Sequence, residues 1–122
     1  MPRFVVLEHT WNGVHWDFML ESEGVLRTWA IDAPIVPGRD LPARSLPDHR
    51  CHYLTYEGAV SGGRGVVRRV AEGDYEASRW TPDEVRVHLG GNQLEGDVVL
   101  CRLETGLSNG PFSWLFRLGN FD

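Results

Sequence analysis

The stretch EHTWNGVHWDFMLE, residues 8–21, places two histidines and an aspartate on either side of an Asn-Gly pair. Asn-Gly between two alternating apolar segments is a strong signal for a β-hairpin. The loop length decides which side chains share a face, because a one-residue slip in pairing moves every side chain to the other face. The register of this hairpin therefore fixes both a core face and a polar face.

Two registers are compatible with the stretch. With the two-residue loop 12–13, His9 points away from His15. With the three-residue loop 11–13, a type I turn that ends in left-handed Gly13, His9 faces His15 directly. We predict the three-residue loop, because it alone separates the polar side chains from an apolar face. That apolar face consists of Phe4, Val6, Trp16, Phe18 and Leu20, with Glu8 as its polar member.

The polar face carries His9, His15 and Asp17. His15 and Asp17 lie about 6.6 Å apart along one strand, and His9 lies opposite. Three such groups can converge on one metal ion, whose bonds to nitrogen and oxygen are about 2.1 Å long. Two histidines and a carboxylate leave coordination positions open, which suits manganese, iron or zinc in a catalytic role. The alternative is a hydrogen-bonded surface network without a metal.

The remainder of the chain predicts an all-β fold. Residues 32–47 carry four of the seven prolines and predict a long loop. We expect a single domain over residues 1–122, a small closed or partly open antiparallel β-barrel of about eight or nine short strands. The predicted strands span residues 4–10, 14–21, 25–31, 51–58, 65–70, 74–80, 84–89, 97–103 and 112–118, separated by Gly-, Asn- and Pro-rich turns such as GLSNGP at 106–111.

Charge and cysteine content limit the kinds of partner and the cellular compartment that the sequence is compatible with. The formal net charge is −5, and all 12 basic residues are arginines. An acidic domain is a poor candidate for binding a long duplex, although one phosphate or one strand end remains open to it. Cys51 and Cys101 form no CxxC pattern, so we predict that both are reduced. With no signal sequence and no apolar segment of membrane-spanning length, a soluble cytoplasmic protein without membrane contact is expected.

A second polar group follows in PDHRCHYLTYEG, residues 47–58. His49 precedes the predicted strand, where a loop can aim it at a ligand, and Arg50 and Tyr53 accompany it. The Gly-rich segment SGGRG, residues 61–65, can present backbone N–H groups and the Arg64 guanidinium to a phosphate, or it is an ordinary hairpin turn. Trp11 at the hairpin tip is the tryptophan that we consider for stacking on a terminal base.

These segments occur in the order found in a known family. FVVLEH-x5-HWDFMLE, DHRCHYLTYEG, SGGRG, LGGNQLEGDVVLCRL and SWLFRL together resemble the 3′-phosphoesterase domain of bacterial DNA ligase D. The resemblance covers nearly the whole chain, as in a free-standing member without polymerase or ligase modules. It implies a compact β-barrel enzyme of DNA repair that uses manganese, with other divalent metals such as zinc as alternatives. It also implies removal of a 3′-terminal ribonucleoside and then of the 3′-phosphate from DNA ends.

The resemblance also assigns roles to residues of this chain. It implies that His9, His15 and Asp17 bind the metal, that His49 contacts the substrate phosphate, and that Tyr53 is an active-site tyrosine. The implied partners are DNA or RNA-tipped DNA 3′ ends, with a separate ligase or polymerase as a further partner.

Two residues depart from the family pattern. Met19 stands where the family usually has arginine, and Leu7 stands where it usually has glutamine. Both would lie on the metal face, so we predict that the site has lost polar contacts to phosphate. Arg50 or Arg64 would then supply the missing guanidinium. These departures keep two alternatives open, a non-catalytic metal-containing module that binds nucleic-acid ends and an esterase of a small phosphorylated metabolite.

Overall fold

The computed structural model describes residues 1–103 and 113–119, so the predicted 106–111 turn and Phe112 lie outside the described residues. Nine antiparallel strands and one short 3₁₀ helix make up the described part of the chain. In chain order they are β1 (Arg3–Thr10), β2 (Val14–Ser22), β3 (Val25–Ile31), β4 (Leu41–His49), η1 (Cys51–Leu54), β5 (Gly58–Ala59), β6 (Val66–Trp80), β7 (Glu84–Gly91), β8 (Glu95–Arg102) and β9 (Trp114–Leu118).

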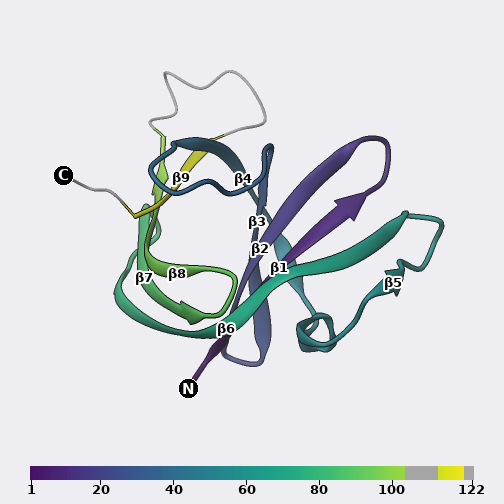
Figure 1. The fold of residues 1–122 in the computed structure, drawn as a ribbon, viewed down its shortest axis with the longest axis horizontal. Coiled ribbons are helices and arrows are strands. Elements are labelled where there is room, and N and C mark those ends of the chain that lie inside the picture. Colours follow the sequence, from purple (N-terminus) through teal and green to yellow (C-terminus); the bar gives the residue numbers. More distant parts are fainter. Residues whose placement is uncertain (104–112, 120–122) are drawn as a thin grey trace.

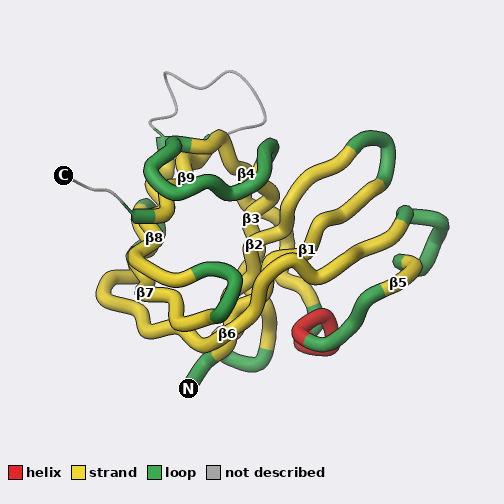
Figure 2. The backbone as a smooth tube through the Cα atoms, in the orientation of Figure 1, coloured by secondary structure: helices red, strands yellow, loops and turns green. Residues whose placement is uncertain are grey.

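The strands form a closed barrel. Their order is β1-β2-β3-β4-β9-β8-β7-β6-β5, and β1 also pairs with β6, which closes the ring. β5 pairs only with the first residues of β6, so it lies outside the ring, as does η1 (Figures 1 and 2). The predicted antiparallel β-barrel is confirmed.

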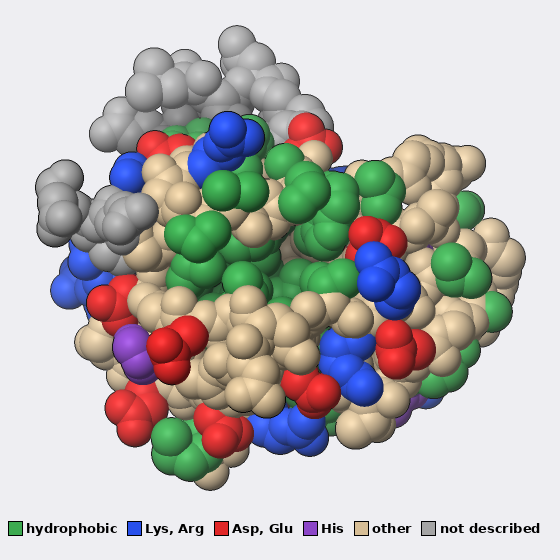
Figure 3. All heavy atoms as spheres, viewed as in Figure 1, with side chains coloured by type: hydrophobic (Ala, Val, Ile, Leu, Met, Phe, Trp, Pro, Cys, Tyr) green, Lys and Arg blue, Asp and Glu red, His purple; other side chains and the backbone are tan. Residues whose placement is uncertain are grey.

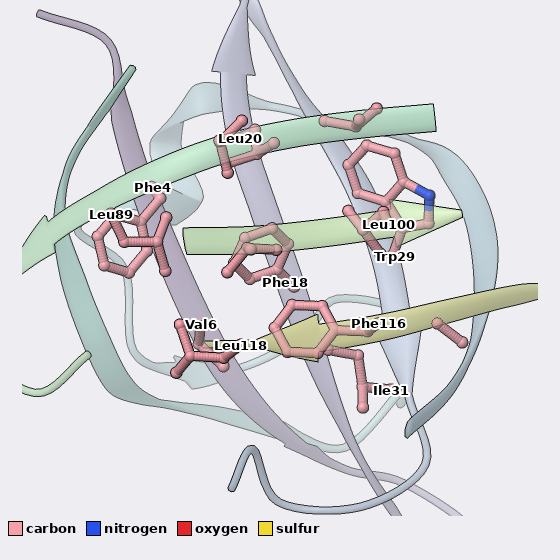
Figure 4. Packing of buried hydrophobic residues seen from close by; sticks show 14 of the residues in the cluster. Phe4, Val6, Phe18, Leu20, Trp29, Ile31, Leu89, Leu100, Phe116 and Leu118 are labelled. Carbon is pink, nitrogen blue, oxygen red and sulfur yellow. The ribbon is translucent and has the colours of Figure 1, made fainter. Parts of the chain in front are cut away.

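The barrel interior is filled by the predicted apolar face of the first hairpin and by the strands opposite. Phe4 and Phe18 are fully buried, and the Phe18 ring meets the Phe116 ring edge to face at a centroid distance of 5.1 Å. Figure 4 shows these side chains meeting inside the ring. Trp29 packs against Trp114 at 5.8 Å. Alternating inward side chains from every strand of the ring thus build one continuous core.

The segments 65–70 and 74–80 are not two strands, as predicted, but one continuous strand, β6. Gly73 is not a turn residue. It lies opposite Gly91, where a Cβ atom would lie 2.7 Å from Gly91 Cα and 2.9 Å from the Phe4 ring. Glycine is needed here because two backbones and an aromatic ring approach one another closely.

The predicted long loop 32–47 was wrong for its second half, which forms most of β4. Leu41 and Ala43 are buried in the core, while Pro42 and Pro47 occupy exposed positions. Pro42 pairs with Leu115 of β9, and Pro47 lies at the register shift of the β3–β4 pairing, a kind of strand position where proline is tolerated.

The predicted strand 51–58 was also wrong. Its first half is the 3₁₀ helix η1, whose residues Cys51 and Leu54 both pack onto apolar side chains. Residues three apart share a face in a 3₁₀ helix, so this spacing fits η1 better than a strand.

A second, smaller apolar cluster lies between η1 and the outer face of the first three strands. Its fully buried members Leu7 and Met19 are covered by Leu54 from η1 and by Val60 and Val67. This cluster holds η1 and the segment after it against the barrel, beside the first hairpin.

Hydrophobic side chains gather in a hollow on the face of the molecule that is seen when looking into the ring of strands (Figure 3). Cys51 and Cys101 are both free, as predicted. Between residues 1 and 103 and between 113 and 119, no helix is long and apolar enough to cross a membrane.

Candidate functional site

The first hairpin has the predicted register. His9 lies opposite His15, Leu7 lies opposite Asp17, and residues 11–13 form the loop. The loop conformation differs from the predicted type I turn, because a positive φ occurs at Asn12 (54°) as well as at Gly13 (111°). Asparagine tolerates this conformation better than other non-glycine residues, so the loop keeps its three-residue length with a different backbone path.

This register brings the side chains of His9, His15 and Asp17 together. Their ligand atoms all lie within 4.8 Å of one another. His15 Nε2 is 2.9 Å from one carboxylate oxygen of Asp17, and His9 Nδ1 is 3.7 Å from the other. The Asp17 side chain is only 3% exposed, so the carboxylate lies at the bottom of the group.

The backbone fixes the tautomer of His9. Its Nε2 lies 2.7 Å from the carbonyl oxygen of Arg64. A carbonyl only accepts hydrogen bonds, so Nε2 carries a proton and Nδ1 is the ring nitrogen left to face Asp17 or a cation. Hydrogen bonding of the second ring nitrogen to a backbone carbonyl is the usual way to orient a metal-binding histidine.

Gly65 allows the Gly-rich loop to reach His9. Its φ of +78° is left-handed, and a Cβ atom there would overlap the carbonyl oxygen of Thr10 and lie 2.7 Å from Trp11 Cβ. The loop carrying Arg64 therefore lies directly on the end of β1. The same residues form the turn between β5 and β6, which pair antiparallel at Gly58–Val67 and Ala59–Val66, so the hairpin-turn alternative is confirmed.

Charge in the cluster favours an ionised carboxylate. Burial alone would raise the pKa of Asp17, but the neighbouring His15 and His9 outweigh it, and the pKa lies below its ordinary value. The Asp17 carboxylate in turn raises the pKa of His9; burial opposes this rise and the Arg64 carbonyl adds to it. The group thus combines a buried anion with two imidazoles that share it.

The cluster fits a divalent metal. His15 Nε2 and Asp17 Oδ1 are buried and have no hydrogen-bond partner among the described residues, because their mutual approach lacks hydrogen-bond geometry. Buried polar atoms are normally satisfied, and such exceptions call for a missing ligand. The donor set of two imidazoles and one carboxylate suits manganese, iron or zinc.

A hollow beside the cluster gathers the other residues singled out by sequence. Arg50, Tyr53 and Arg64 line it, together with His9 and Asp17 from the cluster and with Trp11, Pro47, Asp48, His49, Val60 and Val67. Residues from three segments of the sequence, 9–17, 47–53 and 60–67, therefore meet at one surface. Trp11 is 44% exposed, and its ring stacks on His9 at a centroid distance of 6.3 Å.

His49 and Arg64 are held in place by short-range hydrogen bonds. His49 Nδ1 lies 2.9 Å from the Pro47 carbonyl oxygen, to which it donates, so its Nε2 is free of this contact. The His49 ring also meets the Tyr53 ring edge to face at 5.8 Å. The Arg64 guanidinium donates to the carbonyl and hydroxyl oxygens of Ser61, at 2.8 and 3.3 Å.

A second hollow adjoins the first. It shares His9, Trp11, Asp17 and His49 with the first hollow, and its other lining residues are Asn12, Gly13, Val14, His15, Asp32, Arg44 and Leu46. Sequence reasoning did not single out Arg44, because its segment was predicted to be a loop. If the segment is taken as a strand, the apolar residues Leu41 and Ala43 share its inner face, and Arg44 lies on its outer face.

Leu7 and Met19 lie on the metal face of the hairpin, as predicted, but they do not border the substrate hollows. Both are fully buried in the second apolar cluster, and neither lines either hollow. That the site has lost polar contacts to phosphate at these positions stays a prediction. They form a floor on which η1 packs.

Ion pairing divides the arginines into two groups. Eight have a carboxylate partner, at distances from 2.6 to 3.8 Å: Arg3, Arg27, Arg68, Arg69, Arg79, Arg86, Arg102 and Arg117. Among residues 1–103 and 113–119, Arg39, Arg44, Arg50 and Arg64 have none. Three of these four line the two hollows, so positive charge without a partner gathers at the candidate site despite the acidic net charge.

The remaining histidines lie outside both hollows. The His52 ring packs at a tilt against the rings of Tyr53 and Tyr56, at centroid distances of 4.2 and 5.3 Å. His88 pairs with Asp97 on the surface, at 2.8 Å. Neither belongs to the group of potential ligands.

Fold and site together define an antiparallel β-barrel with a two-histidine, one-carboxylate centre beside an arginine-lined hollow. The DNA ligase D 3′-phosphoesterase domain matches residues 7–102 in sequence. The chain belongs to this family, and the resemblance inferred from the motifs is confirmed.

Longer proteins contain similar segments. Over 108 residues the chain is 32% identical to the multifunctional non-homologous end joining DNA repair protein LigD of Mycobacterium tuberculosis, covering 81% of this chain and 14% of that protein. Over 84 residues it is 33% identical to LigD of Pseudomonas aeruginosa, covering 66% of this chain and 10% of the relative. The chain thus spans a small part of the length of these relatives.

Proposed function

We propose that this chain is a metal-dependent phosphoesterase that removes a 3′-terminal ribonucleoside and a 3′-phosphate from DNA ends. The observation that carries the proposal is the convergence of His9, His15 and Asp17 beside a hollow lined by His49, Arg50, Tyr53 and Arg64. Membership of the 3′-phosphoesterase family supports the reaction class. The names of the LigD relatives support a place in DNA end joining.

The three ligands would hold a divalent ion, manganese by analogy with the family or another such as zinc. When bound, this ion supplies Lewis-acid stabilisation of charge on the phosphoryl oxygens. Asp17 contributes a buried negative charge, and His9 is kept in the required tautomer by the Arg64 carbonyl.

The residues of the first hollow would bind and polarise the phosphate. With protons on both ring nitrogens, His49 would donate from Nε2 to a phosphoryl oxygen while Nδ1 donates to the Pro47 carbonyl. Arg50 and Arg64 offer guanidinium groups, of which Arg64 is oriented by Ser61. Preorganised donors aimed at developing negative charge are among the strongest contributions to catalysis. Tyr53 packs against His49 and would position the substrate oxygens.

The buried apolar positions of Met19 and Leu7 favour one alternative, a module that binds 3′ ends without turnover. At these two positions the chain offers no polar group to a phosphate. The two functions differ in a single observable, which is product formation at saturating substrate.

The test is turnover of a primer-template that ends in a 3′-phosphate or a 3′-ribonucleotide, with added Mn²⁺. We expect product from the wild type and a loss of at least a hundredfold in Asp17→Asn. Asp97→Asn is the matched control, because Asp97 also contacts a histidine, at 2.8 Å, but on the β7–β8 surface. Binding without product would support the end-binding module, and equal activity on mononucleotides would support a small-metabolite esterase.

A further inference from the structure

We propose that Arg44 binds a second phosphate of the substrate, in the hollow adjoining the one that holds Arg50 and Arg64. This inference rests on the proposed function and deepens it, because it makes the substrate a strand of several nucleotides rather than a single phosphate ester. It assigns to Arg44 the positioning of the strand, not a part in the chemical step.

Strand register places Arg44 close to the metal-ligand cluster. Asp17 on β2 lies opposite Ala30 on β3, and Ala30 lies opposite Arg44 on β4. Neighbouring strands are about 4.8 Å apart, so Arg44 stands two strands from Asp17 with only a methyl side chain between them. A larger residue at position 30 would block the arginine, whereas alanine leaves its long side chain room toward the cluster.

The guanidinium of Arg44 is open to an anion. Arg44 is half-buried, and within the described ranges it has no carboxylate partner, unlike eight other arginines. Asp32 also lines this hollow, but it forms no ion pair with Arg44. An unpaired, partly desolvated arginine beside a catalytic cluster is suited to a phosphate, which it can contact with two parallel hydrogen bonds.

The geometry of a strand end decides which phosphate this is. At a 3′ end, every phosphate other than the reacting one lies on the 5′ side. The two hollows meet at His9, Trp11, Asp17 and His49. With the reacting phosphate in the hollow of Arg50 and Arg64, the upstream strand would therefore pass through the hollow of Arg44. The exposed Trp11, which borders both hollows, lies where a base of that strand would be.

The test compares Arg44→Gln with Arg39→Gln. Arg39 is an exposed arginine that also lacks a carboxylate partner in the described part of the chain, but it lines neither hollow. The first readout is the binding of a 3′-phosphorylated single-stranded DNA in Mn²⁺ at several salt concentrations. Arg44→Gln should weaken binding about tenfold and reduce the slope of log K against log salt by about 0.7, as expected for one lost phosphate contact. Arg39→Gln should match the wild type.

The second readout is hydrolysis of a nucleoside 3′-monophosphate, which has no second phosphate. Arg44→Gln should leave this activity within about twofold of wild type while raising KM for the oligonucleotide about tenfold. Equal slopes for the two variants would overturn the inference, and so would an equal loss on the mononucleotide. A wild type that binds DNA but does not turn it over contradicts the proposed function alone, because the binding arm still tests Arg44. A wild type that binds no DNA overturns both.

Discussion

The two faces of the β1–β2 hairpin are built from the same strands and differ in what they bury. The inner face is apolar from Phe4 and Leu20 to Val6 and Phe18, all fully buried in the barrel, and Glu8 is its polar member nearer the loop. The outer face is apolar only near the chain terminus and carries the cluster of His9, His15 and Asp17 near the loop. Because successive side chains of a strand point to opposite faces, one hairpin can supply core residues on one face and site residues on the other.

The difference between the faces is also energetic. Inner side chains gain stability in proportion to the apolar area that they remove from water. At the polar end of the outer face, burial disfavours the Asp17 carboxylate, but the two histidines beside it outweigh this effect and hold its pKa below the ordinary value. The outer face therefore keeps a buried negative charge that a bound cation would share, whereas the buried part of the inner face has no charged group.

The largest expected effect is on the inner face. Phe18→Ala should lower the free energy of unfolding by about 3–5 kcal/mol, because it empties space between Phe4 and Phe116. Urea unfolding measures this loss. Val14→Ala, at a 44% exposed position of the same strand, is the control and should change stability by less than about 0.5 kcal/mol. Similar losses in the two variants would contradict the assignment of the inner face.

A smaller effect is expected where the outer face is apolar. Met19→Arg restores the residue usual in the family, yet it should lower the free energy of unfolding by about 2–4 kcal/mol, since the position is sealed by Leu54 and Val60. Met19→Leu should cost less than about 1.5 kcal/mol. If Met19→Arg is as stable as wild type and more active on a 3′-phosphate, the second apolar cluster does not exclude a charged side chain at position 19.

The smallest effect on stability is expected at the loop that meets the hairpin tip. Gly65→Ala should displace the loop from Thr10 and weaken the His9–Arg64 hydrogen bond, with metal affinity falling about tenfold or more. Gly63→Ala shares the left-handed backbone, with φ of +69°, but its Cβ would meet no atom within 4 Å. Both variants should lose about 1–2 kcal/mol of stability. Isothermal titration with Mn²⁺ should then distinguish them by their metal affinities. Equal metal affinities would show that the loop does not orient His9.

The hairpin register could be predicted because one pairing alone separates nine residues into an apolar and a polar face. The same logic gave the barrel class, since most strands alternate and end in turn residues. It failed at Gly73, where a glycine allows close approach rather than a turn, and at Pro42 and Pro47, which occupy exposed positions of a strand. Local residue preferences do not reveal which backbones will touch.

The candidate site was predictable where its residues are close in sequence. His9, His15 and Asp17 follow from one hairpin, and the motif order brought His49, Tyr53 and Arg64 to attention. Arg44 could not be found in this way, because its place depends on the pairing of β4 with β3 and on the small side chain of Ala30. The burial of Met19 likewise depends on η1, whose residues were predicted to form a strand.

We propose that the polar end of the outer face binds one divalent cation through His9, His15 and Asp17. The most direct test is titration of wild type and of Asp17→Asn with Mn²⁺, monitored through the electron paramagnetic resonance signal of the free ion. Circular dichroism of both proteins without metal confirms that they are folded. We predict that wild type removes one equivalent of free-ion signal and that Asp17→Asn removes none at the same concentrations. Equal binding by the two proteins, or no binding by folded wild type, would contradict the claim.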